Sequence, residues 1–132
     1  MLTMLTVILI QKSTLIQSRT SYNISENIID TVSATCYYPD PSQTDNTPYI
    51  TADNSIINKT SPINHRWIAV SRDLLGVYNM GCTVKISNTG VYDGLWVVKD
   101  KMHKRWRKKI DFLVNKDSYI DSWGDSIIIK RK

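Results

Sequence analysis

The chain alternates short apolar runs with polar, turn-rich connections, and this pattern predicts a small all-β domain. The runs are rich in Ile, Val, Thr and Tyr and are bounded by Gly, Pro, Asn, Asp and Ser, as is typical of strands. Six short strands without a repeat favour a closed barrel, because closure leaves no exposed edge. The expected strands are TVSATCYY (31–38), HRWIAVS (65–71), CTVKIS (82–87), GLWVVKD (94–100), KIDFLV (109–114) and SIIIKRK (126–132).

One short helix is expected before the last strand. The segment KDSYIDSWG (116–124) places Tyr119, Ile120 and Trp123 at helical spacing and then reaches a glycine, where a short helix would end. Residues 19–30 are polar and resemble a linker. We therefore assign residues 1–30 to an N-terminal segment and residues 31–132 to one folded domain.

The N-terminal segment, MLTMLTVILIQKSTLIQS, begins with a largely apolar run that is too short to span a bilayer as a helix. It resembles the apolar region of a secretory signal or short anchor, although no Lys or Arg precedes it and no A-x-A site follows. The alternative is a disordered or packed N-terminal arm. The signal interpretation predicts an exported protein, periplasmic or on the cell surface. Cys36 and Cys82 would be free buried thiols or, after export, one disulfide.

Two aspartates occur in apolar strands, eleven residues apart. Strict alternation places Asp100 on the face of Trp96 and Val98, and it places Asp111 with Leu113, opposite Phe112. Burial of a carboxylate in such a run is costly unless it is paired or used. In a half-covered cleft Asp111 would have a raised pKa. The bland alternative is a solvated aspartate that pairs with a nearby Lys or Arg.

The charge of the chain suits an anionic partner. The formal net charge is +5, and cations concentrate in the run KMHKRWRKK (101–109) and at the C-terminus. Nucleic acid, a membrane surface and an anionic cell-wall polymer all fit this charge. Trp106 could stack on a sugar or a base, or pack within a hairpin. The histidines and cysteines lack metal-ligand spacing, so no metal or cofactor is expected.

The order of several motifs resembles the three-aspartate (3D) domain family, over about residues 33–131. Members of that family are double-psi β-barrels, related to the rare lipoprotein A-like barrels and to the barrel of membrane-bound lytic transglycosylase A. The resemblance therefore implies a six-stranded double-psi β-barrel. It rests on ATCYYPDPSQTDNTPYITAD, HRWIAVSRDLL, GCTVKI, GLWVVKDKMHKRWRKKIDFLV and SWGDSIIIKRK.

Site residues follow from the resemblance one at a time. Asp73, Asp100 and Asp111 match the three family aspartates, and Thr51 matches a loop threonine beside the site. The chain departs from the family by carrying KMHKRW where many members have a Gly-Gly pair. Asp73 also comes two residues late, so Ser71 occupies its usual position.

The resemblance implies a lytic transglycosylase that cleaves the β-1,4 bond between N-acetylmuramic acid and N-acetylglucosamine in peptidoglycan. It assigns Asp111 as the acid and base, Asp100 as its like-charged neighbour, and Thr51, Asp73 and Trp106 as substrate-binding residues. The expected partner of this monomer is a peptidoglycan glycan strand, in cell-wall remodelling or phage lysis. One alternative is a barrel that binds peptidoglycan without catalysis. A nucleic-acid module is less favoured, since the basic run lacks alternating aromatic residues.

Overall fold

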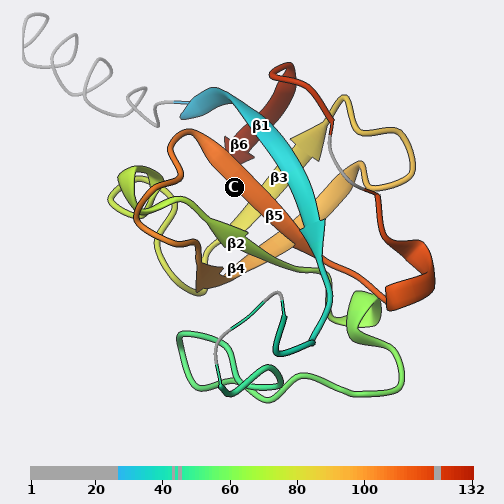
Figure 1. Cartoon of the computed structure of the whole chain (residues 1–132). Helices are drawn as coiled ribbons and strands as arrows, with labels where there is room; N and C mark the ends of the chain where they lie inside the picture. Colours follow the sequence, from blue (N-terminus) through green and yellow to red (C-terminus); the bar gives the residue numbers. More distant parts are fainter. Residues whose placement is uncertain (1–26, 43, 45, 121–122) are drawn as a thin grey trace, which may run out of the picture.

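A computed structural model describes residues 27–42, 44, 46–120 and 123–132 (Figure 1). The N-terminal segment that we assigned to a signal or anchor lies almost wholly outside these residues. The described chain forms β1 (Ile29–Tyr37), β2 (Trp67–Val70), β3 (Thr83–Ser87), β4 (Gly94–Lys101), β5 (Lys109–Leu113) and β6 (Ile127–Arg131). Three short 3-10 helices, η1 (Pro62–His65), η2 (Arg72–Leu74) and η3 (Lys116–Ser118), lie between them.

The six strands close into one barrel in the order β1-β5-β2-β4-β3-β6, which confirms the predicted fold class (Figure 1). Strands β1 and β5 run parallel, as do β2 and β4, and the other neighbours run antiparallel. Exchanging β1 with β4, β2 with β5 and β3 with β6 leaves every neighbour and every direction unchanged. This internal two-fold relation is compatible with a double-psi barrel.

Alternating side chains fill the inside of the barrel. Trp96, Val98 and Phe112 are fully buried there, together with the inward residues of the remaining strands. The rings of Trp96 and Phe112 meet edge to face, with their centroids 4.7 Å apart, a preferred geometry for aromatic pairs. Because the interior is packed with apolar side chains, the polar residues of the strands point outwards.

The segment 38–66 covers part of the outside of this barrel. It runs below the strands in Figure 1 and contains a small hairpin in which Ile50 pairs with Ile56. A second apolar cluster forms between the covering segment and the barrel, from Tyr37, Ile57, Ala69, Met102 and Leu113. One outer face of the barrel is thus shielded from solvent.

The short helix before β6 is smaller than its spacing predicted. It is the single 3-10 turn η3, and the backbone is already extended at Tyr119. Residues 121 and 122 lie outside the described residues, while Trp123 packs against the barrel core. Within the part of the chain that the structure describes, no helix is long and apolar enough to cross a membrane.

Candidate functional site

Four residues form a row across four neighbouring strands on the covered outer face. Thr35 of β1 pairs with Asp111 of β5, Asp111 pairs with Ala69 of β2, and Ala69 pairs with Asp100 of β4. The two aspartates therefore flank one alanine, with backbones about 10 Å apart at ordinary strand spacing. Ala69 is buried in the second apolar cluster and also lines the cavity beside the two aspartates.

A β-bulge brings Asp100 to this face, and here strict alternation gave the wrong answer. The register of β2 against β4 shifts between Ile68 and Ala69, so that Ile68 pairs with Val98 and Ala69 with Asp100. The skipped residue, Lys99, contacts the outward Trp67 ring, with its Nζ 5.4 Å from the ring centroid. A bulge inserts one residue and reverses the later faces. Asp100 consequently leaves the core face on which Val98 lies.

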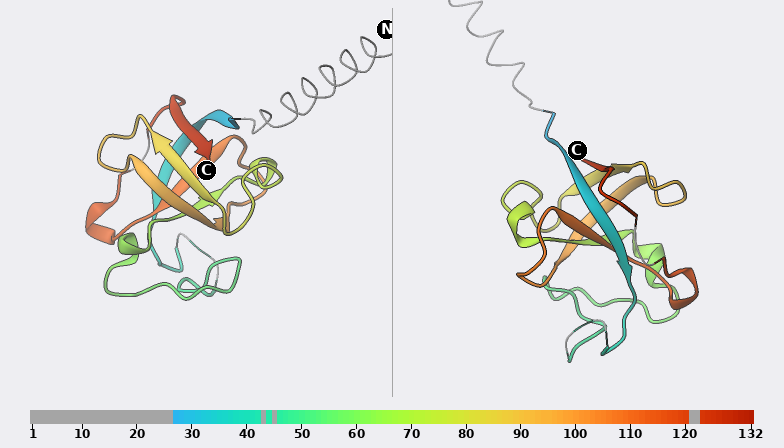
Figure 2. Two further views of the ribbon diagram at one scale, coloured as in Figure 1. Left: turned by 180° about the vertical axis from the view of Figure 1, so that it is seen from behind. Right: turned by 45° about the horizontal axis from the view of Figure 1, so that its top comes forward.

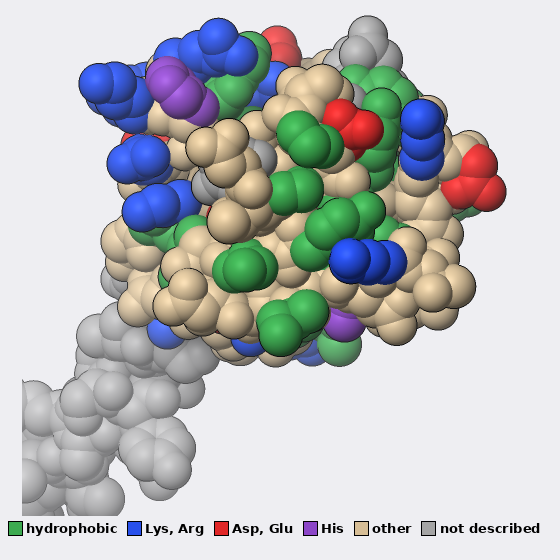
Figure 3. Space-filling model, turned by 60° about the horizontal axis from the view of Figure 1, so that its bottom comes forward, with side chains coloured by type: hydrophobic (Ala, Val, Ile, Leu, Met, Phe, Trp, Pro, Cys, Tyr) green, Lys and Arg blue, Asp and Glu red, His purple; other side chains and the backbone are tan. Residues whose placement is uncertain are grey.

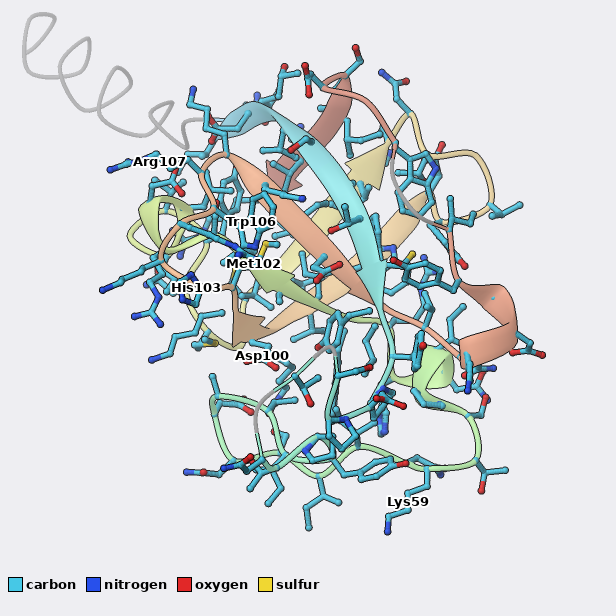
Figure 4. All side chains as sticks on the ribbon, viewed as in Figure 1. Lys59, Asp100, Met102, His103, Trp106 and Arg107 are labelled. Carbon is cyan, nitrogen blue, oxygen red and sulfur yellow. The ribbon has the colours of Figure 1, made fainter. Side chains whose placement is uncertain are left out.

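Asp100 and Asp111 line a common cavity of about 750 Å³ between the barrel, the covering segment and the loop after β4. Its volume lies within the range of ordinary ligand pockets. In Figure 4, Asp100 lies at the end of β4, with Met102, His103 and Trp106 gathered beside it. Figure 3 shows a face with hydrophobic side chains in its middle and Lys, Arg and His side chains gathered along one edge. A second hollow, of about 580 Å³ beside Tyr38 and Tyr49, contains neither aspartate.

The environment of Asp111 favours its protonated form. Burial under the covering segment raises the pKa of this carboxyl from 3.8 to about 7, and the nearby Asp100 carboxylate adds to the rise. Two groups oppose this rise and lower the pKa. The Thr35 hydroxyl donates a hydrogen bond of 2.8 Å to Asp111 Oδ1, and the Lys109 ammonium supplies positive charge. The net result is a carboxyl that exchanges its proton near neutral pH.

Asp100 has a different environment from Asp111. The backbone N–H groups of Ala52 and Lys101 donate to the same oxygen, Asp100 Oδ1, at 3.1 and 2.9 Å. Hydrogen bonds of this kind favour the charged form of a carboxyl. The row therefore carries two acids with different surroundings: Asp111 accepts from a threonine hydroxyl, and Asp100 accepts from two backbone N–H groups.

Tyr37, which the sequence did not single out as a site residue, also lines the cavity. Its side chain is buried, and its hydroxyl lacks a partner in hydrogen-bond geometry among the described residues. Burial, and next the Asp100 and Asp111 carboxylates, raise the pKa of Tyr37 well above its usual range. The hydroxyl therefore remains protonated, and its interaction with the Asp100 side chain also contributes to the rise in its pKa. A ligand atom in the cavity could accept its hydrogen bond.

Thr51 is buried beside the cavity, at the tip of the covering hairpin. Its hydroxyl donates to Asp53 Oδ1 at 2.5 Å and accepts from the Ser55 N–H at 3.1 Å. Asp53 in turn forms an ion pair of 3.1 Å with Lys99, the bulge residue. This network fastens the hairpin tip to β4, so Thr51 supports the position of the Ala52 N–H beside Asp100.

Asp73 lies outside the cavity that holds the other two aspartates. It is on η2, where its carboxylate accepts a hydrogen bond of 3.0 Å from the N–H of Lys108, a residue with a left-handed φ of 43°. Ser71 is fully buried, and its Oγ accepts from the Lys109 N–H at 3.0 Å. Both residues fix the return of the 101–109 loop into β5, and neither lines the cavity.

Trp106 lines the mouth of the cavity and is 37% exposed. Its ring already contacts two cations, with Lys109 Nζ 3.8 Å and the Arg105 guanidinium 4.8 Å from the ring centroid. The ring therefore holds cations at the mouth, a contact that the stacking hypothesis did not include. His103 is exposed at the same mouth.

Cys36 and Cys82 are both free thiols. Cys36 is on β1, and Cys82 comes directly before β3, which is not adjacent to β1 in the barrel. Among the described residues, no cluster of His, Cys, Asp and Glu could hold a metal ion.

No family model, curated protein or solved structure matches this chain. The class that fold and site define is a closed, mixed six-stranded barrel with an acidic cavity on one outer face.

Proposed function

We propose that the domain is a 3D-like double-psi barrel that cleaves peptidoglycan glycan strands as a lytic transglycosylase. The observation that supports this most is the pair of carboxyls in one cavity, with Asp111 titrating near neutral pH and Asp100 two strands away, across Ala69. The resemblance of the motifs to the three-aspartate family supports it independently.

The proposed reaction uses one residue as acid and then as base. Protonated Asp111 donates its proton to the oxygen that links N-acetylmuramic acid to N-acetylglucosamine, and the bond from C1 to that oxygen breaks. The resulting carboxylate accepts the proton of the C6 hydroxyl of the same muramic acid, whose oxygen bonds to C1. The products are a shortened strand and a 1,6-anhydro end, and no water is consumed. Asp111 is again protonated at the end of the cycle.

The surroundings of Asp111 suit both halves of this cycle. A general acid works best when its pKa is close to the working pH, since both protonation states are then accessible. Asp100 would stabilise positive charge that develops at C1, and the Tyr37 hydroxyl, which lines the same cavity, would donate a hydrogen bond to the sugar. Ala69 provides room for the ring between the two carboxyls.

The deciding experiment measures anhydro-muropeptide release from purified peptidoglycan by mass spectrometry. Asp111→Asn keeps the size of the side chain but removes the transferable proton, so turnover should fall by roughly 10²–10⁴-fold. The exposed Asp125→Asn serves as a matched control and should retain parental turnover. Parental turnover in Asp111→Asn would disprove the assignment.

A non-catalytic peptidoglycan-binding barrel is the second candidate. The hydrogen bond from Thr35 and the charge of Lys109 both favour the ionised form of Asp111, which could accept a hydrogen bond from a sugar hydroxyl. Sedimentation of the parent with peptidoglycan, without any release of soluble fragments, would favour this candidate.

We also propose that the protein acts outside the cytoplasm, because its substrate is there and its N-terminus resembles an export signal. A fusion of residues 1–30 to a reporter that is active only after export tests this. A reporter that stays cytoplasmic and inactive would contradict export and favour a phage protein that is released at lysis.

A further inference from the structure

The mouth of the acidic cavity is lined by cations from two separate segments. Arg72 comes from η2, while Lys101 and Arg105 come from the end of β4 and the loop that follows. The floor, by contrast, carries the carboxyls of Asp100 and Asp111. The cavity therefore has charges of opposite sign at its two ends.

Within the described part of the chain, the only ion pair joins Lys99 to Asp53, and none involves Arg72, Lys101 or Arg105. Exposed cations on a surface are ordinarily solvated and contribute little, so their presence alone carries no argument. Their position is the informative feature instead, because residues from two separate segments of the chain line the same cavity.

The loop that carries them is fixed by hydrogen bonds. The Met102 N–H donates to the Val70 carbonyl at 2.9 Å, and Arg72 Nε donates to the Met102 carbonyl at 3.2 Å. This bond orients the Arg72 guanidinium. The Trp106 ring contacts the Arg105 guanidinium, 4.8 Å from the ring centroid. The cations are therefore positioned before any ligand arrives, which lowers the entropic cost of binding an anion.

We infer that the ligand of this cavity is an anionic glycan, with an acidic group at the cationic mouth and a neutral sugar over the carboxyls. This inference rests on the proposed function in one respect, which is that the ligand is a glycan. The acidic group is a carboxylate or a phosphate, since both present oxygens that a guanidinium and an ammonium bind. Asp100 and Asp111 would repel this group from the floor, so the strand would bind in one orientation and register.

The loop itself offers a matched control. Lys101 and Arg105 line the cavity, whereas Lys104 and Arg107 are exposed on the same loop and do not. In Figure 4, Arg107 lies away from Asp100, beyond Trp106. We compare two double variants. The cavity-lining pair is Lys101→Gln with Arg105→Gln, and the control pair is Lys104→Gln with Arg107→Gln. Each removes one lysine and one arginine charge. The two double variants thus have equal net charge and differ in where it was removed.

The test measures binding by calorimetry in the full-length Asp111→Asn background, which prevents turnover. The anionic probe is a glycan strand stripped of peptides by an amidase, so that each muramic acid carries a free carboxylate. The neutral probe is N-acetylglucosamine tetramer. At about 0.15 M salt, where charges beyond about 8 Å are screened, the cavity-lining pair of substitutions should weaken anionic-strand binding about tenfold. The control pair should weaken it less than about twofold, and neither should change binding of the neutral tetramer.

Further measurements distinguish a carboxylate from a phosphate as the bound anion, and they define the results that would contradict the inference. Strands treated with hydrofluoric acid to remove phosphate polymers assign the carboxylate if they still bind, and the phosphate if they do not. Equal weakening by the two pairs would overturn the inference, because a general attraction would then suffice. Equal affinity of the parent for the neutral and anionic probes would also overturn it, as would no binding of either. Selective anion binding by a parent that releases no anhydro products would sink the transglycosylase proposal and leave this inference standing.

Discussion

The titration of Asp111 makes a prediction about folding stability that requires no substrate. A carboxyl whose pKa is higher in the folded than in the unfolded chain binds its proton more tightly when folded. Its contribution to stability is therefore fully present below the unfolded value of about 3.8, and it is lost as pH rises towards the folded value of about 7. Asp111→Asn removes this pH dependence, because an amide does not titrate.

The size of the effect follows from the same two values. A tenfold change in proton affinity corresponds to about 1.4 kcal/mol, so a rise from 3.8 to about 7 amounts to about 4 kcal/mol between pH 4 and pH 8. Relaxation and water entry would reduce this figure, and we expect about 2–4 kcal/mol. The free energy of unfolding of the variant minus that of the parent should therefore be larger at pH 8 than at pH 4 by this amount.

Urea unfolding followed by tryptophan fluorescence measures the free energy of unfolding of both proteins at several pH values. The difference between parent and variant cancels the other titrating groups, which the two share. Asp53→Asn is the control, because the pKa of Asp53 is shifted in the direction opposite to that of Asp111. Burial acts to raise the pKa of Asp53, but hydrogen bonds from Thr51 and Ser55 and the Lys99 ion pair lower it overall. Its stability contribution is lost only at acidic pH, so its variant should show a constant difference between pH 5 and pH 8.

A constant difference between parent and Asp111→Asn from pH 4 to pH 8, within about 0.5 kcal/mol, would refute the reasoning. It would mean that water reaches the carboxyl in the folded protein, and that the covering segment does not seal this face. The acid role would then lose its physical basis, whatever the activity of the variant.

Three further predictions follow from individual contacts. Asp100→Asn removes the carboxylate that helps to raise the pKa of Asp111, so the alkaline limb of the pH-activity profile, where Asp111 loses its proton, should move to lower pH, and an unmoved or alkaline-shifted limb would contradict their coupling. Asp73→Ala removes the acceptor for the Lys108 N–H and should lower the free energy of unfolding by about 1 kcal/mol without changing KM, whereas a large rise in KM would return Asp73 to the site. Burial raises the pKa of the Cys36 thiol from 9.0 to about 12, so iodoacetamide at pH 8 should modify it only after unfolding, and rapid labelling of the native protein, detected by mass spectrometry, would disagree.

The strands could be predicted from sequence because their signal is local. Alternation of apolar residues in the runs around Val84, Trp96 and Phe112 placed each strand within a few residues of its observed bounds. The closed barrel was predicted from the number of strands and confirmed. The short helix was overestimated because Tyr119 and Trp123 have helical spacing, while the chain there forms a single 3-10 turn and then extends.

The site could be predicted only in part, since its geometry depends on pairing between distant segments. Nothing in GLWVVKD marks the bulge, which exists only in the register of β4 against β2 and which reverses the face of Asp100. The covering segment has no periodic pattern, so its burial of Asp111 and Tyr37 could not be inferred. The spacing of Asp73 is likewise explained by its contact with the Lys108 N–H, far along the chain.

The internal two-fold relation of the barrel explains why one face can hold two dissimilar acids. The relation exchanges β5 with β2 and β1 with β4, and therefore maps Asp111 onto Ala69 and Thr35 onto Asp100. The two related strand pairs differ in the backbone as well as in side chains, because β2 and β4 contain the bulge at Ile68/Ala69 while the register of β1 against β5 is continuous. Ala69, the equivalent of Asp111, lines the cavity between the two carboxyls, and Thr35, the equivalent of Asp100, donates a hydrogen bond to the Asp111 carboxyl. The two-fold relation thus places the four groups in one row, while the bulge brings Asp100 onto the covered face and burial there raises the pKa of Asp111.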